Sequence, residues 1–225
     1  MPQCWASSTA NRPCTLSARI TCAPTDTSPI RTPMPNPIPR RRDAAVTREA
    51  ILLSARKAFA QSGYDGAGVL EIAAGAGVTA MLVNRYFGSK EALFAEVIAD
   101  TMASPIILTP DNLSAQNLGR TIATALVSIT EAGNKPLEGF LIMLHSATSK
   151  RAAIIGREQV EKGHQATMAA ALKGAHHEER AALVIALVSG FQVMRQMLEL
   201  SALAKADPQV LIDLLTPLFQ QLVDG

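Results

Sequence analysis

Two polar residues in the segment "AMLVNRYF" could form paired hydrogen bonds with nucleic-acid bases. The guanidinium of Arg85 is suited to the edge of guanine, and the amide of Asn84 is suited to adenine. Ala80 and Met81 precede them and offer apolar atoms that suit a thymine methyl group. Because the segment follows Thr79, a good helix N-cap, these residues predict a short helix whose polar side chains could contact base edges.

Other kinds of chemistry have no support in the sequence. The four histidines are His145, His164, His176 and His177, and none stands at a zinc-ligand spacing such as H-E-x-x-H. All three cysteines lie within the first 22 residues and form no C-x-x-C pair. A glycine-rich phosphate loop and a nucleophile elbow are also missing. We therefore expect neither an enzyme nor a bound metal or cofactor.

Short helical patterns surround this segment and must position it. Gly77 separates two of them and is suited to the positive φ of a tight turn, so residues 68–87 predict a helix-turn-helix unit. A longer helix is predicted near 47–62, with Thr47 as its N-cap and Gly63 as its stop. Ser89 is expected to cap a further helix over about 90–103.

This layout resembles the N-terminal domain of the TetR family of transcriptional regulators. The matching residues are Thr47-Arg48, Ala58-Phe59, Gly63-Tyr64, Val69, Ile72-Ala73, Ala76-Gly77-Val78-Thr79, Tyr86-Phe87 and Ser89-Lys90-Glu91-Ala92-Leu93. The resemblance implies that residues 80–87 form the recognition helix and that Tyr86 and Lys90 contact phosphates. The alternative for Tyr86 is simple packing. It also implies a ligand-binding and dimerising C-terminal domain.

The sequence departs from the family at four positions. It has Ala67, Leu70, Ala80 and Leu82 where the family commonly has polar residues. These residues leave open an alternative in which Met81 and Leu82 are core residues and sequence-specific DNA binding is weak or lost. Arg40, Arg41 and Arg42 precede the first predicted helix, where a flexible arm could reach the DNA minor groove or backbone. A solvated charge run is the alternative for the three arginines.

The charges are unevenly distributed along the chain. Residues 40–90 contain eight basic and four acidic residues, whereas residues 91–225 contain ten basic and fourteen acidic ones. A basic segment beside an acidic body is typical of a nucleic-acid-binding domain on a larger partner domain. Residues 1–39 contain eight of the thirteen prolines, so we expect a disordered extension there. Met34 is an alternative start, and the chain lacks an apolar run long enough to span a membrane.

The sequence after residue 103 predicts helices throughout. We place them near 113–132, 137–148, 151–173, 177–200 and 208–223, with turns at 109–112 and 133–136. Asp111 or Asn112 is expected to cap the first of them, and Asp207-Pro208 is expected to open the last. Residues 181–191 are apolar nearly all round, so this helix needs cover on more than one side. The family resemblance implies that the cover is a four-helix interface made by 177–200 and 208–223 of two subunits. The alternative is a helix buried within one subunit.

Two histidines interrupt apolar stripes in this second part. His164 lies in register with Val160, Met168 and Leu172, and His145 follows Leu137 and Leu141 at the same spacing. The sequence therefore predicts a ligand pocket lined by His145, His164, Met143, Met168 and Phe191. The alternative is that each histidine is a core residue bonded to a backbone carbonyl.

Together these patterns predict an all-α chain with three parts: a 1–39 extension, a 44–103 DNA-binding domain and a 104–225 ligand-binding and dimerisation domain. We expect a cytoplasmic homodimer that binds a palindromic double-stranded DNA operator, acts as a repressor, and is released by a small apolar ligand. The alternative function is a helical small-molecule-binding protein of the same fold without sequence-specific DNA recognition.

Overall fold

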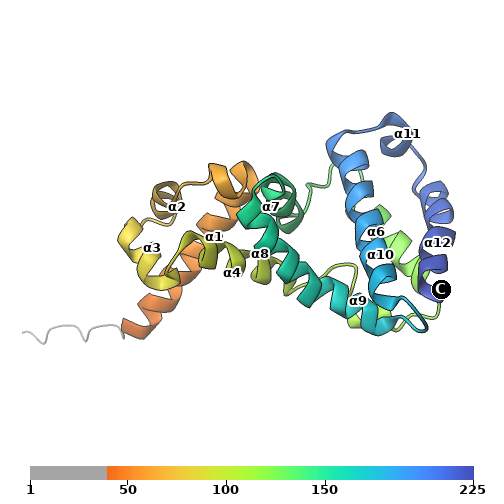
Figure 1. The fold of residues 1–225 in the computed structure, drawn as a ribbon. Helices are drawn as coiled ribbons and strands as arrows, with labels where there is room; N and C mark the ends of the chain where they lie inside the picture. Colours follow the sequence, from red (N-terminus) through yellow and green to blue (C-terminus); the bar gives the residue numbers. More distant parts are fainter. Residues whose placement is uncertain (1–39) are drawn as a thin grey trace, which may run out of the picture. The chain divides into compact units, whose positions relative to one another are not determined.

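The computed structural model describes residues 40–225 and the side chains from Asp43 onward, and this part is helical with no strand (Figure 1). The α-helices are α1 (Arg40–Gly66), α2 (Val69–Gly75), α3 (Ala80–Phe87), α4 (Lys90–Met102), α5 (Pro110–Leu113), α6 (Leu118–Ile129), α7 (Glu138–Ser146), α8 (Lys150–Val160), α9 (Ala166–Ala171), α10 (His177–Gln192), α11 (Ser201–Ala204) and α12 (Pro208–Asp224). Two π-helical segments, η1 (Glu161–Gln165) and η2 (Val193–Met197), continue α8 and α10. The all-α class is confirmed. The predicted disordered extension and the Met34 start lie outside the described residues.

Helices α1 to α4, which we call the head, pack around aromatic residues. Phe59, Tyr64 and Phe94 form edge-to-face and stacked pairs with ring centroids 5.0–6.2 Å apart. Ile51, Ile72, Val83 and Val97 complete this core with almost no exposed surface. Because α2 and α3 each bury one side of two turns, they are held by the core and do not depend on their own helix propensity.

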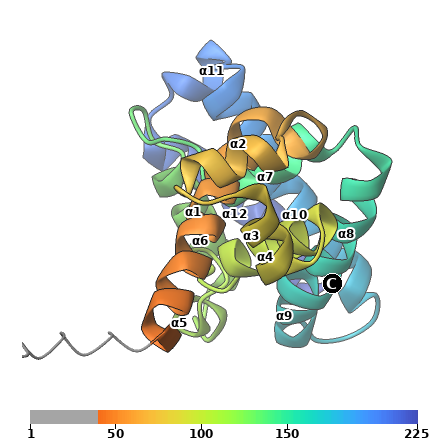
Figure 2. The same ribbon diagram turned by 90° about the vertical axis from the view of Figure 1, so that its left-hand side faces the viewer.

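The turn between α2 and α3 has the predicted form. Gly77 has a φ of 67°, which glycine adopts without a steric penalty. Thr79 caps α3, since its hydroxyl accepts a hydrogen bond from the Leu82 amide at 3.4 Å. Ser89 caps α4 in the same way through the Ala92 amide at 3.1 Å. The helix-turn-helix unit is confirmed, and Figure 2 views the head from the side on which α2 and α3 lie.

Helix α1 corrects two predictions. It begins at Arg40, seven residues before the predicted start, so Thr47 is not an N-cap. The Thr47 hydroxyl instead donates to the Asp43 carbonyl oxygen at 2.6 Å within the helix. At Gly63 the backbone leaves helical geometry, with φ 66° and ψ −177°, and a last turn continues to Gly66. The predicted stop at Gly63 is therefore a kink.

Helix α7 docks on the end of α1 at this kink. A Cβ atom at Gly63 would overlap the carbonyl oxygen of His145. The Tyr64 amide donates a buried hydrogen bond to the Ser146 hydroxyl at 2.9 Å. Ile142 of α7 and Ala152 of α8 are buried in the same core as the head. The aromatic core therefore extends from the head into α7 and α8.

A second core is formed by α6, α9, α10 and α12. Its buried residues include Ile122, Leu126, Met168, Val184 and Phe219. The N-caps that precede this core differ from the prediction, because Thr109 caps α5 and Asn117 caps α6, in place of Asp111 or Asn112. The predicted Asp207-Pro208 start of α12 is confirmed, since the Asp207 carboxylate accepts from the Gln209 amide at 2.7 Å.

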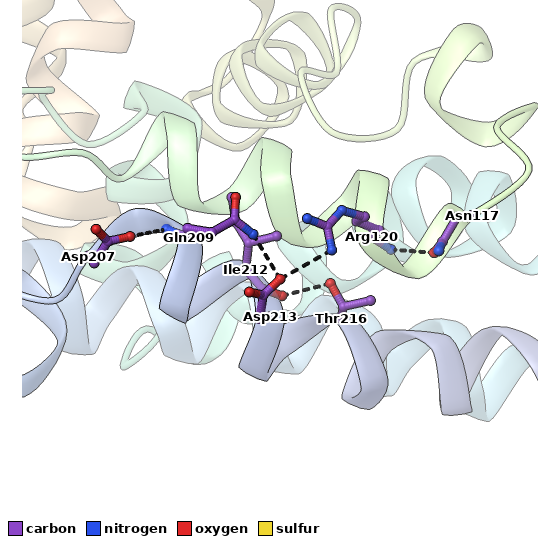
Figure 3. A network of polar contacts seen from close by, with 7 residues as sticks. All are labelled: Asn117, Arg120, Asp207, Gln209, Ile212, Asp213 and Thr216. Carbon is purple, nitrogen blue, oxygen red and sulfur yellow. Dashed lines mark hydrogen bonds and ion pairs between the residues drawn. The ribbon is translucent and has the colours of Figure 1, made fainter.

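A polar network along one edge fixes the rotation of α12 on α6. Arg120 of α6 pairs with Asp213 of α12 at 3.2 Å, and the side-chain Nε2 of Gln209 donates to the same carboxylate at 2.8 Å (Figure 3). The Gly119 amide donates to Gln220 at 3.0 Å on the packed side. With this side turned inward, Leu214 and Leu218 remain exposed on the opposite side of α12.

Candidate functional site

The outer side of α3 carries the predicted base-reading residues. Val83 and Phe87 face the core, so Asn84 and Arg85, which fall between them, are exposed to solvent. Met81 is 80% exposed, which rules out a core position for this side chain. Leu82 and Ala80 are half-buried, and Thr79 is exposed as the N-cap. The helix thus presents a guanidinium, a carboxamide and a thioether together on one accessible surface.

The two predicted phosphate-contacting residues occupy the edge of this surface. Tyr86 is half-buried and packs against the head core. Lys90 is the first residue of α4, and its Nζ lies 4.7 Å from the ring centroid of Tyr64. This cation–π contact holds the ammonium near the N-terminus of α4. The ammonium and the partial positive charge of the helix N-terminus both favour a phosphate.

Arg48 is a head residue to which the sequence analysis gave no role. Its guanidinium carbon lies 5.0 Å from the ring centroid of Phe87, and the same group forms an ion pair with Glu96. Arg48 therefore joins α1 to the end of α3 and to α4. Its position in the sequence carries no signal for this role, because both partners are about forty or more residues away.

Arg40, Arg41 and Arg42 form the first turn of α1. This placement corrects the expectation of a flexible arm directly before the first helix. A contact of these three residues with DNA stays a prediction.

A cavity of about 380 Å³ lies between the two cores. Its wall is largely apolar, with Met102 and Met143 from the first core and Leu108, Val184 and Val188 bordering the second. The polar lining residues are Arg56, Thr101, Ser104, Glu138, His164, Ser189 and Gln192. A predominantly apolar wall with a few polar groups is the usual composition of a small-molecule site.

His164 and Met143 are the two predicted pocket residues that line this cavity. His164 lies in the π-helical segment η1 and is half-buried, and burial lowers the pKa of its imidazole. The ring is therefore neutral near pH 7, with one nitrogen able to donate and the other able to accept a hydrogen bond. Gln192 adds a buried side-chain oxygen with no hydrogen-bond partner in the described part of the chain.

The other three predicted pocket residues lie elsewhere, which corrects that part of the prediction. Nδ1 of His145 lies 2.6 Å from the Ala60 carbonyl oxygen, so this nitrogen donates a hydrogen bond that ties α7 to α1. Met168 is fully buried in the second core. Phe191 packs against that core with its ring 5.8 Å from the Arg195 guanidinium.

Arg56 is one of the cavity residues that the sequence did not predict. It belongs to α1 and therefore brings a residue of the head into the cavity wall. Nη1 lies 3.3 Å from Asp100 of α4, and Nε lies 3.3 Å from Glu138 of α7. Its sequence neighbours resemble those of any solvated arginine on an amphipathic helix, so only the tertiary structure reveals its position.

Two family models match this chain. Residues 51–97 match the family model described as "Bacterial regulatory proteins, tetR family". Residues 116–223 match the model described as "Tetracyclin repressor-like, C-terminal domain". The chain belongs to the TetR family. The first match covers α2 and α3 completely, and the second covers the helices of the second core, so the resemblance on the head residues is confirmed.

Solved structures of this fold include several regulators. A TetR-family regulator from Streptomyces coelicolor A3 is 23% identical, with 84% of this chain and 98% of that chain covered and a TM-score of 0.52. GusR from Salmonella enterica is 16% identical, with coverages of 79% and 95% and a TM-score of 0.62. The multidrug binding protein EbrR, solved in complex with proflavin, is 19% identical, with coverages of 76% and 99% and a TM-score of 0.51. No curated protein matches this TetR-family chain.

Two further observations concern residues 40–225 of this TetR-family chain. Within that range, no group of three or more His, Cys, Asp or Glu side chains could hold a metal ion. Its helices are all too short or too polar to cross a membrane.

Proposed function

We propose that this protein is a ligand-responsive transcriptional regulator that binds a double-stranded operator as a homodimer. The observation that carries this proposal is the outer side of α3, where Arg85 and Asn84 are exposed because Val83 and Phe87 anchor the helix in the core. Guanidinium and carboxamide groups are the side chains that form bidentate contacts with guanine and adenine in the major groove. Lys90 at the start of α4 supplies a phosphate contact beside them.

The experiment that tests this function is a mobility shift with the DNA upstream of the protein's own gene. A retarded complex that survives an excess of unrelated duplex would support specific recognition. The alternative function, ligand binding without sequence-specific DNA recognition, is favoured by the exposed apolar side chains of Leu70 and Met81, which are 78% and 80% exposed. Equal and weak retardation of every duplex at low salt would favour that alternative.

A symmetric dimer would bind a palindromic operator. Two exposed apolar stripes support the proposal of such a dimer. Leu183, Leu187 and Met194 are exposed along α10 and the start of η2. Leu214 and Leu218 are exposed along α12, on the side turned away from the Arg120 network. Residues four apart share one side of a helix, so each helix presents a continuous apolar strip. Such strips from two subunits would bury each other as a four-helix interface.

Replacing Leu214 with glutamate is expected to weaken dimerisation by roughly tenfold or more, because a carboxylate would be buried without a partner. Sedimentation velocity over a dilution series would measure the shift toward monomer. Ile154→Glu is the matched control, since Ile154 is 51% exposed on α8, outside the proposed interface. An Ile154 variant that dissociates as readily as the Leu214 variant would count against the interface.

The proposed repressor mechanism places a small, mostly apolar molecule in the 380 Å³ cavity. EbrR, which shares the fold, was solved with proflavin bound, so this fold can hold an organic molecule of that kind. The cavity is lined by α1 and α4 of the head as well as by α10. A ligand that fits one arrangement of these helices better than another would shift the dimer away from the spacing of the operator half-sites. The cytoplasm is where such a protein would meet its DNA.

His164 provides a pH-dependent test of how the cavity is built. Because burial lowers its pKa, the folded protein binds a proton at this site less readily than the unfolded chain does. This contribution to stability is present above the ordinary histidine pKa of about 6.5 and is lost as the pH falls from there through the lowered pKa of the folded state. Relative to His164→Leu, the wild type is therefore expected to lose thermal stability between pH 7.5 and 5.5. If the melting temperatures of the wild type and His164→Leu change equally with pH across this range, His164 is not desolvated.

A further inference from the structure

The cavity wall contains an ion-pair cluster that joins three helices. Arg56 of α1 faces Asp100 of α4 through Nη1 and Glu138 of α7 through Nε, both at 3.3 Å. Arg56 and Glu138 line the cavity themselves, whereas Asp100 is not a lining residue. A ligand in the cavity would therefore contact the ion pairs that connect α1 of the head to α4 and α7.

The cluster carries an excess negative charge. One guanidinium faces two carboxylates, and the remaining titratable lining residue is His164, which is neutral near pH 7 because burial lowers its pKa. Opposite charges within a few ångströms attract even at a partly solvated site, and like charges repel. The cluster as a whole thus favours a positively charged group beside it and disfavours an anion.

The contact between Arg56 and Glu138 is the part of the cluster that a ligand can reach, because both residues line the cavity and Asp100 does not. Although Glu138 Oε2 lies 3.3 Å from Arg56 Nε, that nitrogen is buried and forms no hydrogen bond to any described residue. The Glu138 side chain is 47% exposed, so the pair is also screened by water. A ligand cation could replace it at little cost.

We propose that the effector carries a positive charge at one end of an apolar body, and that this charge pairs with Glu138 in place of Arg56. Arg56 then remains with Asp100, so α1 keeps its charged contact with α4 and loses the one with α7. This inference rests on the proposed ligand-responsive function. It identifies the chemical class of the effector and the contact through which occupancy of the cavity reaches the head.

The test uses three molecules that share a ten-carbon chain and differ in head group: decylamine, 1-decanol and decanoate. Calorimetric titration of the full-length protein at pH 7, below the micelle concentration, gives three dissociation constants. We expect decylammonium to bind roughly three- to tenfold more tightly than decanol, as for a partly screened ion pair, and decanoate to bind most weakly. Glu138→Gln should remove the preference for the amine while leaving the affinity for decanol unchanged.

Glu131→Gln is the matched control, because Glu131 is exposed and does not line the cavity. Arg56→Gln tests the coupling separately: this variant should still bind decylamine, but the amine should no longer release its DNA as it releases that of the wild type. Equal binding of the three molecules, or tightest binding of decanoate, would overturn the inference while leaving the cavity as a ligand site. Failure of all three to bind would contradict the cavity site itself, and an amine preference that persists in Glu138→Gln would exclude Glu138 as its partner.

Discussion

Replacing Arg85 with alanine is expected to weaken binding to the specific operator by about 1–3 kcal/mol, as for the loss of one good base contact. Arg85 is exposed on α3, so the substitution removes the guanidinium without opening the core. Binding curves from mobility shifts on the upstream DNA, at one fixed salt concentration, would measure the change. The variant should also discriminate less between the operator and a duplex altered at the contacted base.

Lys90→Ala is the comparison that separates base reading from backbone contact. A lost phosphate contact should lower affinity for specific and unrelated duplexes alike and should reduce the salt dependence by about one charge. Asn84→Ala should behave like Arg85→Ala if it reads adenine. Unchanged operator affinity in all three variants would mean that the outer side of α3 does not read DNA.

Gly63→Ala is expected to destabilise the protein by more than about 3 kcal/mol, which would make it one of the most damaging single substitutions in the head. Two causes act together. The backbone angles at Gly63, φ 66° and ψ −177°, are in a region that only glycine adopts readily. An added Cβ would also overlap the His145 carbonyl oxygen of α7, and a backbone atom cannot move aside as a flexible side chain can.

Gly77→Ala is the matched control, because Gly77 has nearly the same φ, 67°, but a Cβ there would meet no atom within 4 Å. Its cost should be the backbone term alone, about 1–2 kcal/mol. Urea unfolding of both variants at one protein concentration measures the difference. Similar losses in the two variants would show that the contact between α1 and α7 adds nothing to the backbone strain.

The parts of the structure that local chemistry determines could be predicted from the sequence. Thr79, Ser89 and Asp207 are N-caps because their side-chain oxygens can reach the next free amides, whatever lies elsewhere in the chain. The turn at Gly77 likewise depends on one residue's conformational freedom. These signals place α3, and its alternation of buried and exposed residues then identifies Asn84 and Arg85.

The cavity could be predicted only in part, and η1 explains why. The stripe of Val160, His164, Met168 and Leu172 assumes a continuous α-helix with residues four apart on one side. The π-helical segment Glu161–Gln165 inserts a wider turn, which rotates the following residues relative to those before it. Val160 and His164 consequently line the cavity, whereas Met168 and Leu172 enter the second core.

Contacts between distant segments account for the remaining differences. The position of His145 depends on the Ala60 carbonyl of α1, which no periodicity in α7 reveals. The role of Arg56 depends on Asp100 and Glu138, more than forty residues away. The residues next to His145 in the sequence fit a cavity position as well as a contact with α1, and those next to Arg56 fit a solvated position as well as a cavity position. Only the packing between helices distinguishes these positions.

The burial of Ile142 and Ala152 in the head core bears on how regulators of this kind can be recombined. A chimera that joins residues up to 103 to a foreign effector domain would leave Phe94, Val97 and Ile98 without part of their natural cover. The foreign domain would have to present apolar side chains where α7 and α8 stand, together with a hydroxyl for the Tyr64 amide. The unit that can be exchanged between such proteins therefore includes α7 and α8 as well as the head. It is longer than the segment up to residue 103 that the sequence motif delimits.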